Sequence, residues 1–242
     1  MRRLARHRVR ASKSAAWWSM TKLAPYNATW EALIPTPTVE FWFDFASNYS
    51  YLSVMRIEAA AIRLGVRIVW KPFLLGPIFQ SFGWSNSPFM LQKAKGDYMW
   101  QDIVRECQKI GVPWTRPSTF PRNSVLPLRV AALGADQPWI GAFSQRIMLR
   151  NFTQDRDIHT PEAVCEALSA LGLPAEAILA EALSDANKQR LREQTHAAQI
   201  RGIFGAPTFF VGDAMFWGND RLDDALACAA ALQSNPHPLQ TG

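Results

Sequence analysis

Apolar and polar positions near the start of the folded part of the chain predict a strand, a helix and a second strand. Residues 39–45 form a short, mainly apolar run that is typical of a buried strand. Residues 50–64 then place apolar side chains three and four positions apart, which predicts a helix with Ser53 on its polar face and Leu64 on the face available for the core. Residues 66–72 alternate apolar and polar positions, as a strand does. This order implies a right-handed crossover between two parallel strands.

The middle of the chain has helical spacing throughout. Glycine, proline and serine between Gly76 and Pro88 predict a long loop. Proline, aspartate, serine or threonine stands near several of the helix starts that follow, as helix N-termini prefer. The predicted helices cover residues 93–110, 127–133, 138–152, 161–171, 175–183 and 187–201.

Two strands and a helix close the chain. Residues 208–211 and 214–217 flank the turn pair Gly212-Asp213, which predicts a hairpin, and residues 219–232 have helical spacing. The fold class is therefore α/β, with a thioredoxin-like core of β-α-β and β-β-α that an all-helical insertion interrupts. We expect the thioredoxin-like domain at residues 37–75 and 202–234 and the insertion domain at residues 76–201.

The net charge of +6 lies in a basic N-terminal arm, residues 1–36. Its cations near the start are Arg2, Arg3, Arg6, Arg8, Arg10 and Lys13. Removing these six from the 26 Lys and Arg leaves 20, which equals the 20 Asp and Glu. We expect no nucleic-acid partner, because the remainder has no basic stripe of the kind a phosphate backbone requires. The arm is a disordered tail, a targeting segment, or an extension ahead of a true start at Met20.

Cysteine content and hydropathy restrict the location and the chemistry. Cys107, Cys165 and Cys228 are isolated, with neither a Cys-x-x-Cys pair nor the Cys/His spacing of a metal site. Scattered single thiols predict a reduced, cytoplasmic protein without metal. No stretch reaches the roughly 18 apolar residues of a membrane span, so we expect no membrane association.

Two segments carry the candidate chemistry. Ser47 stands where the first strand meets the first helix, and Pro207 precedes the apolar strand at residues 208–211. A hydroxyl at a helix N-terminus that faces a proline-fixed backbone can hold and activate a small thiol, which indicates glutathione chemistry. The alternatives are that Ser47 is a plain N-cap and that Pro207 is a trans proline on an edge strand. We assign Asp44 no catalytic role and interpret His159 and His196 as structural or exposed.

Four motifs in order resemble one family. They are Phe43-Asp-Phe-Ala-Ser-Asn-Tyr-Ser-Tyr-Leu52, Lys95-Gly-Asp-Tyr-Met99, Phe204-Gly-Ala-Pro-Thr208 and Phe216-Trp-Gly-Asn-Asp-Arg-Leu222. Together they resemble the 2-hydroxychromene-2-carboxylate isomerases, glutathione-dependent enzymes of the DsbA-like thioredoxin superfamily allied to kappa-class glutathione transferases. The resemblance implies that Ser47 and Ser50 replace the two cysteines of a thioredoxin-like oxidoreductase, which excludes disulfide exchange. Asn48 departs from the family, which usually has proline there.

The resemblance also implies roles for individual residues. Ser47 would activate the glutathione thiol, the backbone of Ala206 and a cis Pro207 would pair with its cysteinyl unit, and Lys95 would reach its glycine carboxylate. The further glutathione-binding residues implied are Asn86, Trp217, Gly218, Asn219 and Asp220. The implied substrate-binding residues are Phe120, Arg122 and Asn123, with Arg122 facing a pyruvyl carboxylate. Helix capping by Asn219 or Asp220 and a solvated Lys95 are the alternatives.

The expected function is glutathione-dependent cis–trans isomerisation of 2-hydroxychromene-2-carboxylate or a related aromatic-degradation intermediate. Two alternatives stay open at this point. A kappa-like transferase would use the same thiolate and release a conjugate, and a non-catalytic DsbA-like protein would only bind a ligand. The expected partners are glutathione and a small aromatic substrate, with a homodimer as a possible assembly.

Overall fold

Four strands form a mixed sheet in the order β2-β1-β3-β4 within residues 36–234, the part of the chain that the computed structural model describes. Strands β1 and β2 are parallel, whereas β3 is antiparallel to both β1 and β4. The strands are β1 (Thr38–Phe43), β2 (Arg67–Pro72), β3 (Thr208–Val211) and β4 (Ala214–Trp217). The basic arm and the alternatives raised for it lie outside the described residues, apart from Thr36.

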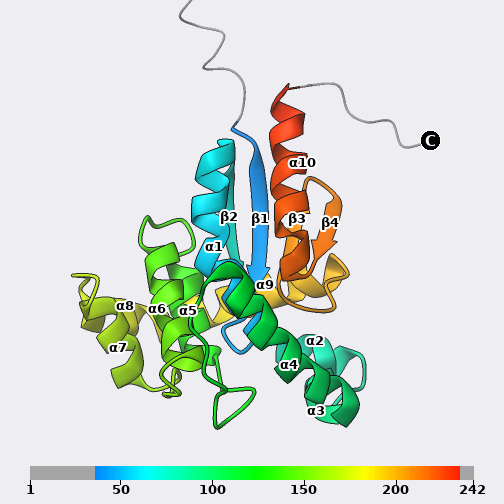
Figure 1. Cartoon of the computed structure of the whole chain (residues 1–242). Coiled ribbons are helices and arrows are strands. Elements are labelled where there is room, and N and C mark those ends of the chain that lie inside the picture. Colours follow the sequence, from blue (N-terminus) through cyan, green and yellow to red (C-terminus); the bar gives the residue numbers. More distant parts are fainter. Residues whose placement is uncertain (1–35, 235–242) are drawn as a thin grey trace, which may run out of the picture. The chain divides into compact units, whose positions relative to one another are not determined.

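Helices enclose this sheet and extend beyond one end of it (Figure 1). They are α1 (Asn48–Leu64), α2 (Leu75–Ser81), α3 (Pro88–Leu91), α4 (Lys93–Ile110), α5 (Val125–Leu133), α6 (Ile140–Phe152), α7 (Pro161–Ser169), α8 (Ala175–Ala182), α9 (Asp185–Ile200), the 3-10 turn η2 (Asn219–Arg221) and α10 (Leu222–Ser234). Figure 1 shows α1 and α10 alongside the sheet and α2 to α8 gathered at the carboxyl end of β1. The predicted thioredoxin-like sheet with a helical insertion is therefore confirmed. None of the helices in residues 36–234 is long and apolar enough to cross a membrane.

The alternation of side chains along β1 separates two hydrophobic clusters. Phe41 is fully buried and stacks on Phe209 at 5.3 Å between ring centroids, in the cluster that includes α1 and α10. Trp42 points the other way and meets Phe73 and Phe210 edge-on, in a smaller cluster that contains Ala198 of α9. Because both faces are covered, the only parts of β1 and β3 left to build a site are their ends and the loops that follow.

Two predicted loop and helix boundaries differ from the structure. The segment expected as loop after Gly76 begins with the short helix α2, whose Ile78 is buried and whose Leu75 N–H donates to Asp44. Pro77 falls in the first turn of α2, where a missing N–H costs no helical hydrogen bond. At the other end, the helix predicted from residue 219 starts as the 3-10 turn η2 before α10 takes over.

The assignment of two α1 side chains was wrong. Ser53, expected on the polar face, is completely buried because its hydroxyl donates to Asn219 Oδ1 at 3.1 Å. Leu64, expected in the core, is 45% exposed in the last turn of the helix. The helical period alone does not show that the η2 turn meets the Ser53 face.

Candidate functional site

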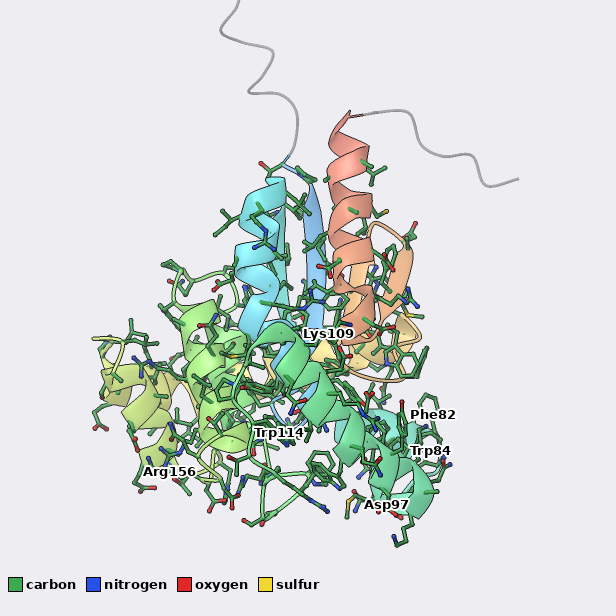
Figure 2. All side chains as sticks on the ribbon, in the orientation of Figure 1. Phe82, Trp84, Asp97, Lys109, Trp114 and Arg156 are labelled. Carbon is green, nitrogen blue, oxygen red and sulfur yellow. The ribbon has the colours of Figure 1, made fainter. Side chains whose placement is uncertain are left out.

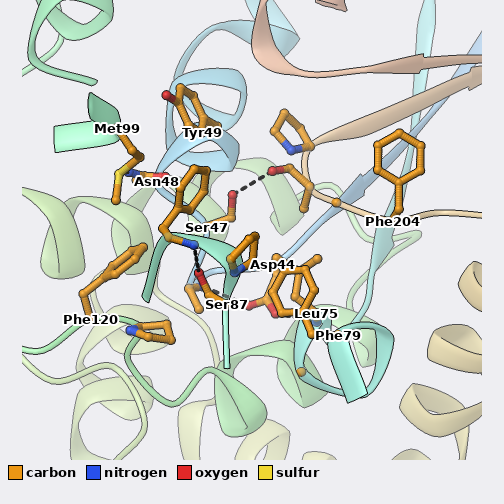
Figure 3. A pocket seen from close by; sticks show the side chains of 18 of the residues that line it. Asp44, Ser47, Asn48, Tyr49, Leu75, Phe79, Ser87, Met99, Phe120 and Phe204 are labelled. Atoms are coloured by element: carbon orange, nitrogen blue, oxygen red, sulfur yellow. Dashed lines mark hydrogen bonds between the residues drawn. The ribbon is translucent and has the colours of Figure 1, made fainter. Parts of the chain in front are cut away.

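Ser47 lies at the turn between β1 and α1, at the end of the sheet where the insertion begins. It is the N-cap of α1, with extended backbone angles of φ −86° and ψ 118°. Its Oγ accepts a hydrogen bond from Ser50 N–H at 3.1 Å and donates one to the carbonyl oxygen of Ala206 at 2.9 Å. Figure 3 shows this second contact, which joins residues that are 159 positions apart in the chain. The side chain is mostly buried, at 8% exposure, yet it borders the cavity described below.

The strand facing Ser47 carries the predicted proline. The Ala206–Pro207 peptide bond is cis, and Thr208 Oγ1 donates back to the Gly205 carbonyl at 2.9 Å. The Ala206 N–H has no acceptor among residues 36–234, whereas the Ala206 carbonyl accepts from Ser47. One backbone donor beside Ser47 is therefore free to bind a ligand, and the neighbouring acceptor becomes free when the Ser47 hydroxyl turns away.

A third segment, residues 218–220, lies beside this strand because Gly218 N–H donates to the Pro207 carbonyl at 3.0 Å. Gly218 has φ +108°, and a Cβ there would approach Asp220 Oδ1 to 2.4 Å, so the turn requires glycine. The N–H groups of Asn219 and Asp220 have no acceptor in the described part of the chain. Free N–H groups at the start of a helical segment suit an anionic ligand group.

Helix α1 holds Asn219 in place from behind. Arg56 Nη2 donates to the Asn219 carbonyl at 2.8 Å, and Arg56 Nε donates to Asn219 Oδ1 at 3.2 Å. Arg56 also forms a salt bridge with Asp223 at 2.9 Å. The Asn219 side chain, only 4% exposed, is thus committed to the protein, and what this residue offers a ligand is its backbone N–H.

A buried carboxyl group anchors the Ser47 turn. Asp44 is 2% exposed, and its Oδ1 accepts from Ala46 N–H at 2.9 Å and from Ser124 Oγ at 2.6 Å. Its Oδ2 accepts from Leu75 N–H at 2.9 Å. Burial raises the pKa of Asp44, and the three hydrogen bonds oppose that rise. The Asp44 side chain therefore ties the turn before α1 to α2 and to the residue preceding α5.

These segments border one cavity of about 1140 Å³. All twelve residues that the sequence predicted as site residues line it: Ser47, Asn86, Lys95, Phe120, Arg122, Asn123, Ala206, Pro207, Trp217, Gly218, Asn219 and Asp220. The structure therefore brings together the N-terminal turn, the insertion and the C-terminal hairpin.

Two of these residues belong to the insertion side of the cavity. Asn86 is exposed in the loop before α3, and its Oδ1 accepts from Ser87 N–H at 2.7 Å. Lys95 is exposed on the first turn of α4, with its Nζ 5.8 Å from the centre of the Phe89 ring. The Asn86 amide nitrogen and the Lys95 ammonium group can both turn toward a ligand.

Arg122 does not fit the role predicted for it. Its guanidinium group is turned into the protein, where Nη2 meets Asp155 Oδ1 at 2.5 Å and Nη1 donates to Asn151 Oδ1 at 3.0 Å. The side chain is only 4% exposed, and the Arg122 guanidinium holds the pKa of Asp155 below its usual range. The positive charge is therefore neutralised within the protein, and the expectation that it faces a substrate carboxylate is corrected.

Aromatic side chains form part of the cavity wall, whereas others pack inside the insertion. Trp114 stacks on Phe152 at 5.5 Å inside the insertion. Trp84 lines the cavity and lies beside Phe82 near α2 and α3 (Figure 2). Phe120 lines the cavity and meets Trp100 edge-on at 4.8 Å. The cavity thus offers apolar surface next to the polar Ser47 end.

A family model described as a DSBA-like thioredoxin domain matches residues 38–228. The chain belongs to this family. It is 32% identical to a 2-hydroxychromene-2-carboxylate isomerase of Sphingobium xenophagum, over 78% of this chain and 95% of the relative. It is 27% identical to glutathione S-transferase kappa 1 of Rattus norvegicus, over 78% of this chain and 89% of the relative. A solved 2-hydroxychromene-2-carboxylate isomerase superposes with a TM-score of 0.73 at 27% identity, over 83% of this chain and all of that one.

The three cysteines of this chain are not placed for disulfide exchange at the Ser47 turn. Serines stand at positions 47 and 50, and all three cysteines are free thiols on other elements. Cys107 is buried, which raises the pKa of its thiol to about 12 and leaves it protonated at neutral pH. Any thiolate at Ser47 must therefore come from a ligand.

Sequence reasoning missed a second polar group on the cavity wall. Tyr49 donates from its hydroxyl to Asp102 Oδ2 at 2.7 Å, and both residues line the cavity. The signal for Asp102 was its spacing: Lys95, Tyr98, Asp102 and Glu106 follow one another at three or four residues along α4, and all line the cavity. The partner Tyr49 is 53 residues away in sequence, which periodicity does not reveal.

Proposed function

We propose that this chain is a glutathione-dependent cis–trans isomerase of 2-hydroxychromene-2-carboxylate or a related aromatic-degradation intermediate. The observation that carries the proposal is the pairing of the Ser47 hydroxyl, at the N-terminus of α1, with the backbone beside the cis Ala206–Pro207 bond in one cavity. The similarity to 2-hydroxychromene-2-carboxylate isomerases supports the substrate class.

The cavity residues fit each charged part of glutathione. The free N–H groups of Asn219 and Asp220 suit the γ-glutamyl carboxylate, and the Asp220 side chain, 68% exposed, suits its ammonium group. The Ala206 N–H and carbonyl suit the cysteinyl backbone as a short added strand. Lys95 suits the glycine carboxylate. The Gly218 turn, which a Cβ would obstruct, keeps the space beside Asp220 open.

Ser47 then stabilises the ionised form of the bound thiol. Its hydroxyl proton lies toward Ala206 here, and because a hydroxyl rotates freely about its C–O bond, it can donate to sulfur instead. Lowering a thiol pKa by about two units requires roughly 2.7 kcal/mol. One charge-assisted hydrogen bond of about 1.5–3 kcal/mol with a helix-dipole contribution of about 0.3–1 kcal/mol is sufficient.

When bound, glutathione would supply a nucleophilic thiolate for reversible addition to the conjugated double bond of the substrate, which permits rotation about that bond. The chain itself supplies ionisation through Ser47, orientation through Ala206 and Asp220, and an apolar wall at Phe120 for the aromatic ring. The product expected is of the trans-benzylidenepyruvate type.

The test is Ser47→Ala. We expect turnover to fall by about 10² or more, as for the loss of a key electrostatic donor, together with loss of the ultraviolet absorbance of the bound thiolate. The substitution also removes the N-cap of α1, which costs roughly 1 kcal/mol. Ser184→Ala is the matched control, because Ser184 caps α9 through Asn187 N–H and lies away from the cavity.

Three results would contradict the proposal. Full activity of Ser47→Ala would show that Ser47 does not activate the thiol. A stable conjugate with electrophilic aromatics, without an isomerised product, would identify a kappa-like transferase using the same site. Absence of glutathione binding in calorimetry would leave only a non-catalytic DsbA-like binding protein.

A further inference from the structure

Tyr49 and Asp102 form a polar pair on the cavity wall that the thiolate chemistry does not use. Tyr49 lies on the first turn of α1, two residues after Ser47, and Figure 3 draws it with Met99 on one side of the cavity. Its hydroxyl donates to Asp102 Oδ2 at 2.7 Å, and Tyr98 approaches the other oxygen, Oδ1, at 3.5 Å. Both members of the pair are half-buried and both line the cavity.

The electrostatics of this wall keep the phenol protonated. Burial, followed by the hydrogen bond to Asp102 and its charge, raises the pKa of Tyr49, with smaller contributions from Tyr98 and Glu106. A neutral phenol that donates to a carboxylate retains lone pairs on its own oxygen. It can accept a proton from a hydroxyl in the cavity while its own proton moves to the carboxylate.

The proposed substrate requires such a transfer. 2-Hydroxychromene-2-carboxylate carries its hydroxyl on the ring carbon that also bears the ring oxygen, so it is a cyclic hemiketal. Its double bond is held cis by the ring. Rotation about that bond is possible only after the ring has opened, and thiolate addition does not move the hemiketal proton. An acid–base group on the cavity wall would move this proton and speed the opening of the ring.

We propose that Tyr49 is the catalytic acid–base residue that opens the hemiketal ring, with Asp102 as the positioning residue that takes up the proton. The hemiketal O–H proton passes to the Tyr49 oxygen as the Tyr49 proton passes to Asp102. The electrons of that O–H bond form the ketone, and the bond from this carbon to the ring oxygen breaks with its electron pair on the ring oxygen. Tyr49 then returns a proton to the resulting phenoxide and recovers its own from Asp102, so no proton is gained or lost.

A purely structural tether would have the same hydrogen bond, and the chain contains one for comparison. Tyr51, two residues further along α1, is completely buried and donates to the carbonyl of Pro113, just beyond the end of α4. Tyr51 does not border the cavity. Tyr51→Phe is therefore the matched control for loss of a phenol that joins α1 to the α4 region.

The experiment follows ring opening and isomerisation separately. The inference rests on the proposed function, but the measurement of ring opening does not need glutathione. Exchange between the closed hemiketal and its open cis ketone is measured by NMR without glutathione. Glutathione-dependent turnover is then measured with the closed substrate and with cis-o-methoxybenzylidenepyruvate, whose methylated oxygen cannot close the ring. We expect Tyr49→Phe to lower protein-catalysed exchange and closed-ring turnover by about 10²-fold, within the usual range for a general acid–base. Open-chain turnover should stay within about two-fold, since the thiolate step is intact.

The outcomes separate this inference from the proposed function. Asp102→Asn should give the same split between closed and open substrates, whereas Tyr51→Phe should show none. Equal slowing of both substrates by Tyr49→Phe, or no slowing of exchange, would overturn the relay. If the wild-type chain fails to isomerise the open-chain substrate, the proposed function fails, while the exchange measurement still decides the role of Tyr49.

Discussion

Replacing Arg56 with methionine tests whether this side chain positions the turn at residues 218–220, where we propose that glutathione binds. Methionine keeps an unbranched apolar stem but removes every hydrogen bond from the guanidinium group to Asn219 and Asp223. The Arg56 side chain is 22% exposed, so its two bonds to the buried Asn219 are only partly screened by water. Asp223 is 69% exposed, and its salt bridge contributes about 0–1 kcal/mol.

The expected loss of stability follows from the hydrogen bonds to Asn219 and the salt bridge to Asp223. Hydrogen bonds to charged groups contribute about 1.5–3 kcal/mol each, and a pair that shares one partner is less than additive. We expect Arg56→Met to lower the free energy of unfolding by about 2–4 kcal/mol. At this chain length each kcal/mol lowers Tm by about 2–4 °C, so Tm should fall by roughly 5–15 °C.

The functional effect should be confined to glutathione affinity. Without Arg56 the Asn219 carbonyl loses its hydrogen bond and the Asn219 side chain keeps only the bond from Ser53, so the free N–H groups of Asn219 and Asp220 are held less firmly. We expect KM for glutathione to rise about ten-fold or more, with turnover at saturating glutathione nearly unchanged because Ser47 is untouched. Steady-state kinetics well below the Tm of the variant and urea titration provide the two measurements.

Asp223→Asn is the matched control. It removes the exposed carboxylate partner and leaves the bonds to Asn219 in place, so stability should change by less than about 1 kcal/mol and KM should not change. If both variants lose equal stability, the contact with Asn219 contributes nothing. If Arg56→Met loses stability but binds glutathione normally, Arg56 supports the fold and has no part in positioning the turn.

Two further substitutions test individual carboxylates. Asp220→Asn should raise KM for glutathione about ten-fold or more with turnover preserved, since a charge-assisted hydrogen bond contributes about 1.5–3 kcal/mol. Asp224→Asn, four residues further along the chain, is the control. An unchanged KM in Asp220→Asn would leave Asp220 only a capping role. Asp44→Asn should remove the titration of this carboxyl group. Burial raises the folded-state pKa of Asp44 above its ordinary value of 3.8. The free energy of unfolding of the wild type relative to the variant, measured by urea titration, should therefore fall as pH rises from about 3.8. A relative stability that rises with pH would show that its three hydrogen bonds outweigh burial and favour the carboxylate.

Motifs with a local structural cause could be predicted from the sequence. Ser47 was identifiable because a strand that runs into a helix requires an N-cap, and Pro207 because a proline ahead of an apolar strand restricts the backbone. The Gly212-Asp213 turn fixed the hairpin for the same reason. In each case neighbours within a few residues decide the conformation.

The features that were missed depend on partners distant in sequence. The sequence around Arg122 does not show whether its side chain faces the cavity or the protein interior. The partner that turns it inward, Asp155, is 33 residues away. Ser53 is buried because Asn219 lies 166 residues further along the chain. Helical periodicity says which face of a helix is polar, but it does not say whether that face meets solvent or another polar segment.

The two halves of the site have different origins in the chain, and this makes their roles separable. Ser47, Ala206 and the turn at residues 218–220 come from the thioredoxin-like part and line the cavity where we propose that glutathione binds. Asp102 and Phe120 come from the insertion and line the part of the cavity that we propose for the aromatic ring. Loss of Ser47 should therefore slow closed and open substrates alike, because both need the thiolate. Loss of Tyr49, which joins the two halves through Asp102, should slow only the closed substrate, so the ratio of the two turnover numbers identifies which half of the site a substitution has damaged.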